Sequence, residues 1–238
     1  CDEGASARTE LAGLLAGWVL ELESGRKPPT WWTSGVGTLL LLELSKFRAA
    51  QLLWNRLQQI YQPQGQAQGH PQPQLDIGVA QSGFYWSGLD REVNLLRSAC
   101  AIFVANLSGA KSVRVHSFEQ HPQAQHWAHN QNRLMRHEGR LAQQTDPLSG
   151  CYAVESLAEQ LAHQVWQLAQ SNLSQGACLD WVAELVQKDR DSYLERLDRD
   201  QAVLVGTSRY APLQGDPQEI SVAHRASSGF EDLRRLWK

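Results

Sequence analysis

The sequence predicts an α/β fold whose strands form a parallel sheet. Helical and strand-like stretches alternate along most of the 238 residues, with strands about 30 to 45 residues apart, which is the rhythm of βαβ units. Three strand-like stretches are too few to close an eight-stranded barrel. The pattern therefore fits either part of an open α/β sheet or the second part of a (β/α)8 barrel whose first part is absent.

The first helix is predicted over residues 5–24. Its apolar residues fall on one helical face, and the run Gly25–Pro29 ends it. These apolar residues are Leu11, Leu14, Leu15, Trp18 and Leu22. The short aromatic stretch Thr30–Val36 is then a candidate strand, bounded by Pro29 and Gly37.

A long helix is predicted from there to about Tyr61, and a loop and a second strand follow it. The apolar stripe of the helix consists of Leu40, Leu44, Phe47, Ala50, Trp54, Leu57 and Tyr61. Gln62–Gln74 is rich in Gln, Pro and Gly, a composition typical of a solvated loop. Leu75–Gln81 is the second strand candidate.

The next helix is predicted to begin at Asp90, a good N-cap residue, and to end near Ser108. We expect Val93, Leu96, Cys100, Phe103 and Val104 to face inward. The alternating stretch Ser112–His116 is the third strand candidate. A polar helix then extends to about Gln144, and its weak apolar face (Trp127, Leu134, Leu141) predicts partial burial.

The stretch Thr145–Trp166 organises the last part of the chain. Asp146 and Pro147 end the preceding helix, Ser149 and Gly150 form a turn, and apolar residues then recur at helical spacing. Helices are predicted over about 154–173 and 176–197, and a short strand over Ala202–Gly206. The tail from Pro212 is rich in turn residues and ends in an amphipathic piece, Phe230–Trp237.

Composition narrows the class of protein. Lysine and arginine number 22, aspartate and glutamate 25, and the net charge is -3 with both signs interspersed. This balance argues against nucleic acid or a membrane as a partner. No apolar run reaches the roughly 18 residues of a transmembrane helix, and the start lacks the features of a signal peptide. We expect a cytoplasmic protein, and the start at Cys1 indicates a sequence that begins inside a longer one.

The cysteines and a cluster of histidines could each be structural or could bind a metal. Cys1, Cys100, Cys151 and Cys178 form no CxxC pair, so we expect reduced, mostly buried thiols rather than disulfides or a zinc site. The histidines of residues 116–137 are dense. They lack acids at matching spacing, which favours a polar, solvated or interfacial helix over a metal site.

Five stretches, in order, resemble the methylmalonyl-CoA mutase family. The Asp-Pro-x-x-Gly-x-Tyr-x-Val-Glu-x-Leu run that begins at Asp146 is similar to the end of the family's barrel domain. The other four are Asp2–Ala5 with Glu10–Ala12, Glu43–Trp54, Leu89–Arg97 and Gln201–Tyr210. In the second of these four, Glu43 and Lys46 are expected to form a structural ion pair at i,i+3, with Arg48 nearby. The alternative is that these charges contact another subunit.

The resemblance implies a (β/α)8 TIM-type barrel that encloses a CoA ester, followed by a separate cobalamin domain. It implies a radical rearrangement between methylmalonyl-CoA and succinyl-CoA. Residues 1–144 would be the later βα units of the barrel. Residues 145–238 would be the barrel-end motif, a helical linker and a C-terminal extension. The resemblance begins just after the family's catalytic Tyr-His and stops before the cobalamin domain.

The departures from the family fall on its ligand positions, at predicted strand ends. Pro29 and Trp31 stand where the family has an Arg and a Ser that contact CoA. Asp76, Gly78 and Ala80 stand where it has the Arg, His and Gln that reach CoA and cofactor. Lys111 and Gln120 replace a Gln and a cofactor-facing Glu, whereas Ser112 and Phe118 match.

This pattern resembles the non-catalytic small subunit of heterodimeric mutases. The chain would then carry no catalytic residue and no cofactor. It would pair with a catalytic large subunit that holds the adenosylcobalamin. Lys111, Ser112 and Arg114 are the candidates for residual binding of a CoA ester. The alternative is a divergent cobalamin-dependent mutase acting on another acyl-CoA, which would require new ligands at Asp76, Gly78 and Ala80.

Overall fold

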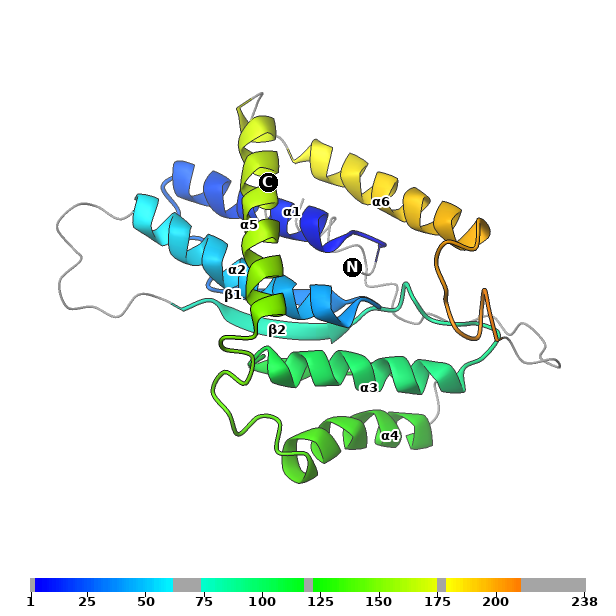
Figure 1. Ribbon diagram of the computed structural model, residues 1–238. Coiled ribbons are helices and arrows are strands. Elements are labelled where there is room, and N and C mark those ends of the chain that lie inside the picture. Colours follow the sequence, from blue (N-terminus) through cyan, green and yellow to red (C-terminus); the bar gives the residue numbers. More distant parts are fainter. Residues whose placement is uncertain (1–2, 62–73, 118–121, 175–178, 211–238) are drawn as a thin grey trace.

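The computed structural model describes residues 3–61, 74–117, 122–174 and 179–210. These residues form a mixed α/β unit with a small parallel sheet and mostly helices (Figure 1). The elements, in order, are α1 (Ala7–Glu23), β1 (Trp31–Val36), α2 (Leu40–Tyr61), β2 (Asp76–Gln81), α3 (Glu92–Leu107), β3 (Ser112–Arg114), α4 (Pro122–Arg133), a π-helical turn η1 (Leu134–Glu138), α5 (Tyr152–Leu173) and α6 (Asp180–Asp198).

The sheet has the order β1-β2-β3, and both strand pairs are parallel. Helix α2 connects β1 to β2, and α3 connects β2 to β3. The predicted parallel α/β class is thereby confirmed. The three strands found in the described part of the chain do not themselves close a barrel.

The two faces of the sheet differ in what covers them. Trp32, Val36, Ile77 and Val79 point to one face and are buried in a core shared with α1, α2 and α5. Alternate residues point to the other face, because side chains alternate along a strand. We call this second face the open face and define it by the residues Trp31, Thr33, Asp76, Gly78, Ser112 and Arg114, which the strand register places side by side.

Helices α1, α2 and α5 form the packed layer behind the sheet (Figure 1). Ser6 caps α1 by accepting a hydrogen bond from the Thr9 amide at 3.3 Å. Trp18 of α1 meets Trp54 of α2 edge to face, with ring centroids 5.0 Å apart. Helix α5 lies across both helices, and Val165 is among its fully buried residues. Most residues of the predicted apolar faces of the first two helices therefore form the core, whereas Tyr61 at the end of α2 is exposed.

The predicted inward face of α3 is wrong for most of its residues, although Val104 is buried as predicted. Asp90 does accept a hydrogen bond from the Val93 amide in the first turn, at 3.3 Å, although the helix begins at Glu92. Leu96, however, is 65% exposed and Phe103 is 37% exposed. The buried side of α3 consists of Asn94, Ser98, Ala101, Ile102, Val104, Ala105 and Asn106. Asn94 is held inward because its side chain accepts from the Ser87 amide at 2.8 Å and donates to the Ser87 carbonyl at 2.9 Å. The small residues then allow α3 to approach the sheet closely.

The strand predicted at Ala202–Gly206 is also wrong, because this segment folds back on itself. The Gly206 amide donates to the Arg209 carbonyl at 2.7 Å, and the Ser208 amide donates to the Leu204 carbonyl at 2.9 Å. Ser87 also donates to the Gly206 carbonyl, which anchors the segment beside the start of α3. Local bonds of this kind leave few backbone groups for a strand ladder.

The structure also corrects the predicted length of the polar helix and the predicted burial of the cysteines. The polar helix predicted to reach Gln144 ends at Arg133 and continues only as the turn η1. Cys100 and Cys151 are exposed rather than buried. The other two cysteines, the tail from residue 211 and nearly all of the predicted loop at Gln62–Gln74 lie outside the described residues.

Candidate site on the open face of the sheet

The structure brings most of the predicted site residues together on the open face, but not at the strand ends where chemistry was expected. Trp31, Asp76 and Ser112 are the first residues of their strands, so they lie at the amino end of the sheet. Gly78 and Arg114 follow at alternate positions on the same face. Pro29 precedes β1, and Phe118 and Gln120 lie outside the described residues. The departures that lie on β1 and β2 therefore line a face of the sheet rather than its carboxyl edge.

Lys111 is paired with Asp76 at the amino end of the open face. Its Nζ lies 2.9 Å from Oδ1 of Asp76, and the two side chains are 59% and 34% exposed. The backbone supports this approach, because the Lys111 amide donates to the Ile77 carbonyl at 2.8 Å. The two opposite charges that the sequence places in the predicted site therefore offset each other.

The indole of Trp31 packs over Gly78 in the middle of the open face. Its indole Nε1 donates to Oγ1 of Thr33 at 3.0 Å. A Cβ at Gly78 would lie only 2.8 Å from that oxygen and 3.0 Å from both the indole and Oγ of Ser112. Three side chains thus converge on one glycine. A larger residue at this position would have to push them apart.

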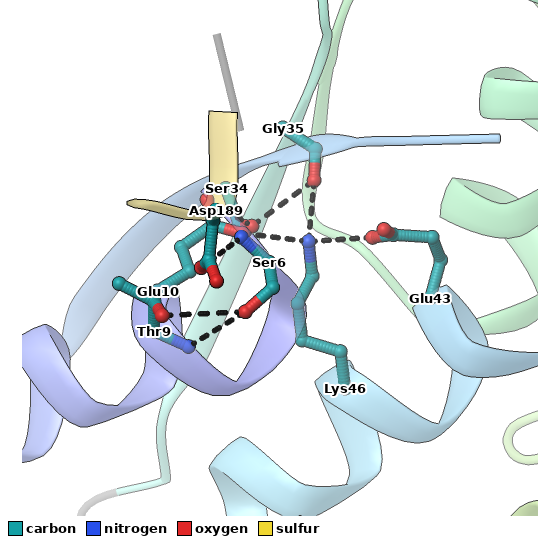
Figure 2. A network of polar contacts seen from close by, with 8 residues as sticks. All are labelled: Ser6, Thr9, Glu10, Ser34, Gly35, Glu43, Lys46 and Asp189. Atoms are coloured by element: carbon teal, nitrogen blue, oxygen red, sulfur yellow. Dashed lines mark hydrogen bonds and ion pairs between the residues drawn. The ribbon is translucent and has the colours of Figure 1, made fainter. Parts of the chain in front are cut away.

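Behind the sheet, a buried lysine joins three elements. Lys46 of α2 has no exposed side-chain surface, and its Nζ donates to Glu10 of α1 at 2.8 Å and to the Gly35 carbonyl of β1 at 2.6 Å. Glu43, one turn earlier on α2, pairs with the same Nζ at 2.5 Å. Figure 2 shows these groups converging on the ammonium. The predicted Glu43–Lys46 ion pair is confirmed.

Glu10 and Lys46 remain ionised because they face each other. Burial opposes ionisation of Glu10, but the attraction of Lys46 outweighs it and lowers the pKa of Glu10 from 4.5 to about 2. Burial likewise opposes the charge on Lys46, and its attraction to Glu10 and Glu43 outweighs that effect and raises the pKa of the ammonium. Glu43 and Lys46 are too deeply buried to reach another subunit, so their role is structural.

Arg48 makes the second connection of the same motif, and it points the other way. Its guanidinium donates to both carboxylate oxygens of Asp146, at 2.8 and 3.1 Å, and lies 3.0 Å from Glu155. The hydrogen bond to Asp146 raises the pKa of Arg48. Two of the family-like motifs, far apart in sequence, are thus tied together at the start of α5.

Sequence reasoning missed the long-range partners in these sets. Glu10 was not identified as a partner of Lys46, although a carboxylate on the largely apolar first helix was an available signal. Nothing in the sequence pattern singled out the pairs Asp76–Lys111 and Arg48–Asp146. Both depend on which segments the fold places side by side.

The histidines of α4 bond within their own helix. The ring of His129 contacts the backbone carbonyl of Gln125 at 2.8 Å, and Nε2 of His126 contacts the side-chain Nδ2 of Asn130 at 2.9 Å. Over the described ranges, no three His, Cys, Asp or Glu residues are grouped so that they could hold a metal ion. Within the same ranges, no helix has both the length and the apolar character needed to cross a membrane.

Consecutive βαβ units with a helical layer behind the sheet define an α/β protein of the parallel class. The sequence model of the family described as methylmalonyl-CoA mutase matches residues 31–236. This chain therefore belongs to the methylmalonyl-CoA mutase family.

Three relatives show the range of the similarity. The chain is 26% identical over 211 residues to the methylmalonyl-CoA mutase of Rhizobium meliloti (strain 1021), covering 84% of this chain and 29% of the relative. It is 29% identical over 182 residues to the methylmalonyl-CoA mutase small subunit of Porphyromonas gingivalis, covering 70% and 29%. It is 26% identical over 263 residues to the probable methylmalonyl-CoA mutase small subunit of Mycobacterium bovis, covering 97% and 41%. The chain thus spans well under half the length of these relatives.

Proposed function

We propose that this chain is part of a structural, non-catalytic small subunit of methylmalonyl-CoA mutase. It supplies the later part of a (β/α)8 barrel and a helical linker. Its partner is a catalytic large subunit, which carries the adenosylcobalamin and interconverts methylmalonyl-CoA and succinyl-CoA. This chain supports that subunit and contributes neither a catalytic residue nor a cofactor site.

The observation that carries the proposal is the state of the open face. A CoA ester is strongly anionic and needs cationic or hydrogen-bond donors for its phosphates. Here the Lys111 charge is directed to Asp76 at 2.9 Å, and Trp31 covers Gly78 at the centre of the face. The two similar small subunits support the same proposal.

Ser112 and Arg114 remain as candidates for a residual contact with a CoA ester, together with Lys111. Ser112 and Arg114 are both exposed on the open face. Arg114 keeps one exposed guanidinium on this face, whereas the charge of Lys111 is directed to Asp76. The proposal therefore predicts weak or absent CoA binding by this chain.

The first test is the composition of the complex purified from its own cells. Native mass spectrometry should show one copy of this subunit with one larger chain. Spectroscopic quantification should find at most one cobalamin per pair. A homodimer with cobalamin on this chain would contradict the proposal and favour the divergent acyl-CoA mutase instead.

A further inference from the structure

Helix α3 carries an apolar stripe that the described residues leave exposed. We call Leu96, Cys100 and Phe103 the α3 stripe. These residues lie four and three positions apart, which places them on one helical face. Leu96 is 65% exposed, Phe103 is 37% exposed and Cys100 is exposed between them. Leu89, just before the helix, is 37% exposed and adds to the apolar surface at this end.

Most of the contact of α3 with the other described residues is made by the side of the helix opposite the stripe. The helix buries the opposite side, where Asn94 bonds to Ser87 and where Ala101, Ile102 and Ala105 are buried. Leu96 alone leaves about two thirds of its surface in water, and burial of a side chain of this type stabilises by about 1.5–3 kcal/mol. A covering segment would therefore gain appreciable free energy.

The chain itself leaves the described structure next to this stripe. Arg97, the neighbour of Leu96, donates from its guanidinium to the Val205 carbonyl. A Cβ at Gly206 would lie 2.8 Å from Asp90, so the segment is tightly packed at the start of α3. The described residues end at Tyr210, five positions after Val205, and 28 further residues follow in the sequence (211–238).

Those residues include one segment whose apolar pattern matches the stripe. Phe230, Leu233, Leu236 and Trp237 recur at three, three and one positions. Leu96 and Phe103 are seven positions apart on the helix, so the stripe is about 10 Å long. The nineteen residues between Tyr210 and Phe230 can extend to about 65 Å, which is long enough to reach the stripe.

We propose that Phe230–Trp237 docks on the α3 stripe and covers it. A second copy of the chain fits less well. A stable interface buries about 800 Å² on each partner, whereas three partly exposed side chains offer a few hundred Å² at most. A short segment of the same chain, already anchored at Val205, suits a patch of this size. The proposal does not depend on the mutase role.

Cys100 provides a direct probe, because it lies in the middle of the stripe. The experiment measures the rate at which N-ethylmaleimide modifies Cys100 in the complete protein, by mass spectrometry of its peptides. Cys151 is the internal reference, because it is exposed before α5 and far from the stripe in sequence. The test variant is Phe230→Ser/Leu233→Ser/Trp237→Ser. Ile220→Ser, in the same tail but outside the docking segment, is the control variant.

The proposal expects slow modification of Cys100 in the unaltered protein and in the Ile220→Ser control. The triple variant should react roughly tenfold faster or more, because it removes the apolar contacts that hold the covered state. Cys151 should react equally in all three proteins. Rapid modification of Cys100 in the unaltered protein would overturn the proposal. Slow modification in the triple variant as well would also overturn it, since another occupant, such as a second copy or a partner chain, would then cover the stripe.

Discussion

The two sides of the sheet each hold a lysine paired with an acid, and the two pairs have opposite consequences. Lys46 lies behind the sheet with no exposed side-chain surface and joins α1, β1 and α2. Lys111 lies on the open face with 59% of its side chain exposed. Water screens the second pair and not the first. The buried pair therefore stabilises the fold, whereas the exposed pair mainly determines the local charge of the open face.

The largest expected effect is the loss of the buried lysine. Lys46→Met would leave Glu10 and Glu43 buried without a cation, and we expect it to lower the free energy of unfolding by about 3–5 kcal/mol. Urea denaturation followed by circular dichroism measures this. Lys188→Met, on the surface of α6, is the control and should change stability by less than about 0.5 kcal/mol. Equal effects of the two substitutions would show that the Lys46 cluster contributes nothing to the fold.

The second expected effect is a loss of stability at low pH that is caused by protonation of Glu10. The folded pKa of Glu10 is about 2 and its ordinary value is 4.5, so the unfolded chain takes up the proton first as the pH falls. The stabilisation is complete above about pH 5 and is lost between there and pH 2, by on the order of 3 kcal/mol. Glu10→Gln should remove this part of the pH dependence. The measurement is the urea midpoint from pH 7 to pH 2.5, and parallel curves for the two proteins would contradict the prediction.

The third effect concerns packing on the open face. Gly78→Ala places a Cβ 2.8 Å from Oγ1 of Thr33 and 3.0 Å from the Trp31 indole. We expect a loss of about 1–3 kcal/mol, because strands and side chains must move apart. Gly83→Ala is the matched control, because a Cβ there meets nothing within 4 Å. Equal losses in the free energy of unfolding for the two substitutions would mean that Trp31 does not pack tightly against Gly78.

These expectations also show how far the sequence alone could predict the molecule. Helices α1 and α2 follow from local periodicity, and strand β1 follows from its aromatic residues and the Pro and Gly that flank it. The Glu43–Lys46 pair follows from its i,i+3 spacing. The orientation of α3 could not be predicted from apolar residues, because hydrogen bonds of the polar Asn94 decide which side faces inward. A hydrophobic pattern therefore fails to predict which side of a helix is buried when a polar residue on the opposite side forms buried hydrogen bonds.

The candidate site depended even more on long-range contacts. The resemblance to the family identified Asp76 and Lys111 as departures, but their positions 35 residues apart gave no sign that they meet. Parallel pairing decides this, because it places the start of β2 beside the start of β3. The carboxylate of Asp76 does not by itself make this face negative, because Lys111 offsets its charge. The Asp76–Lys111 pair as a whole therefore adds no net charge to the open face.

The smallest expected effect is the most informative about function. Asp76→Ala and Lys111→Ala each remove an exposed partner, so each should change stability by less than about 1 kcal/mol. In the assembled mutase, calorimetric titration with a CoA ester should give the same affinity for both variants and for the control Lys188→Ala. If this face still held the phosphates, Lys111→Ala would weaken binding and Asp76→Ala would strengthen it, because the lysine would be lost in one case and released in the other. Opposite shifts of that kind would mean that the open face is a working ligand site, and the chain could not then be a purely structural subunit.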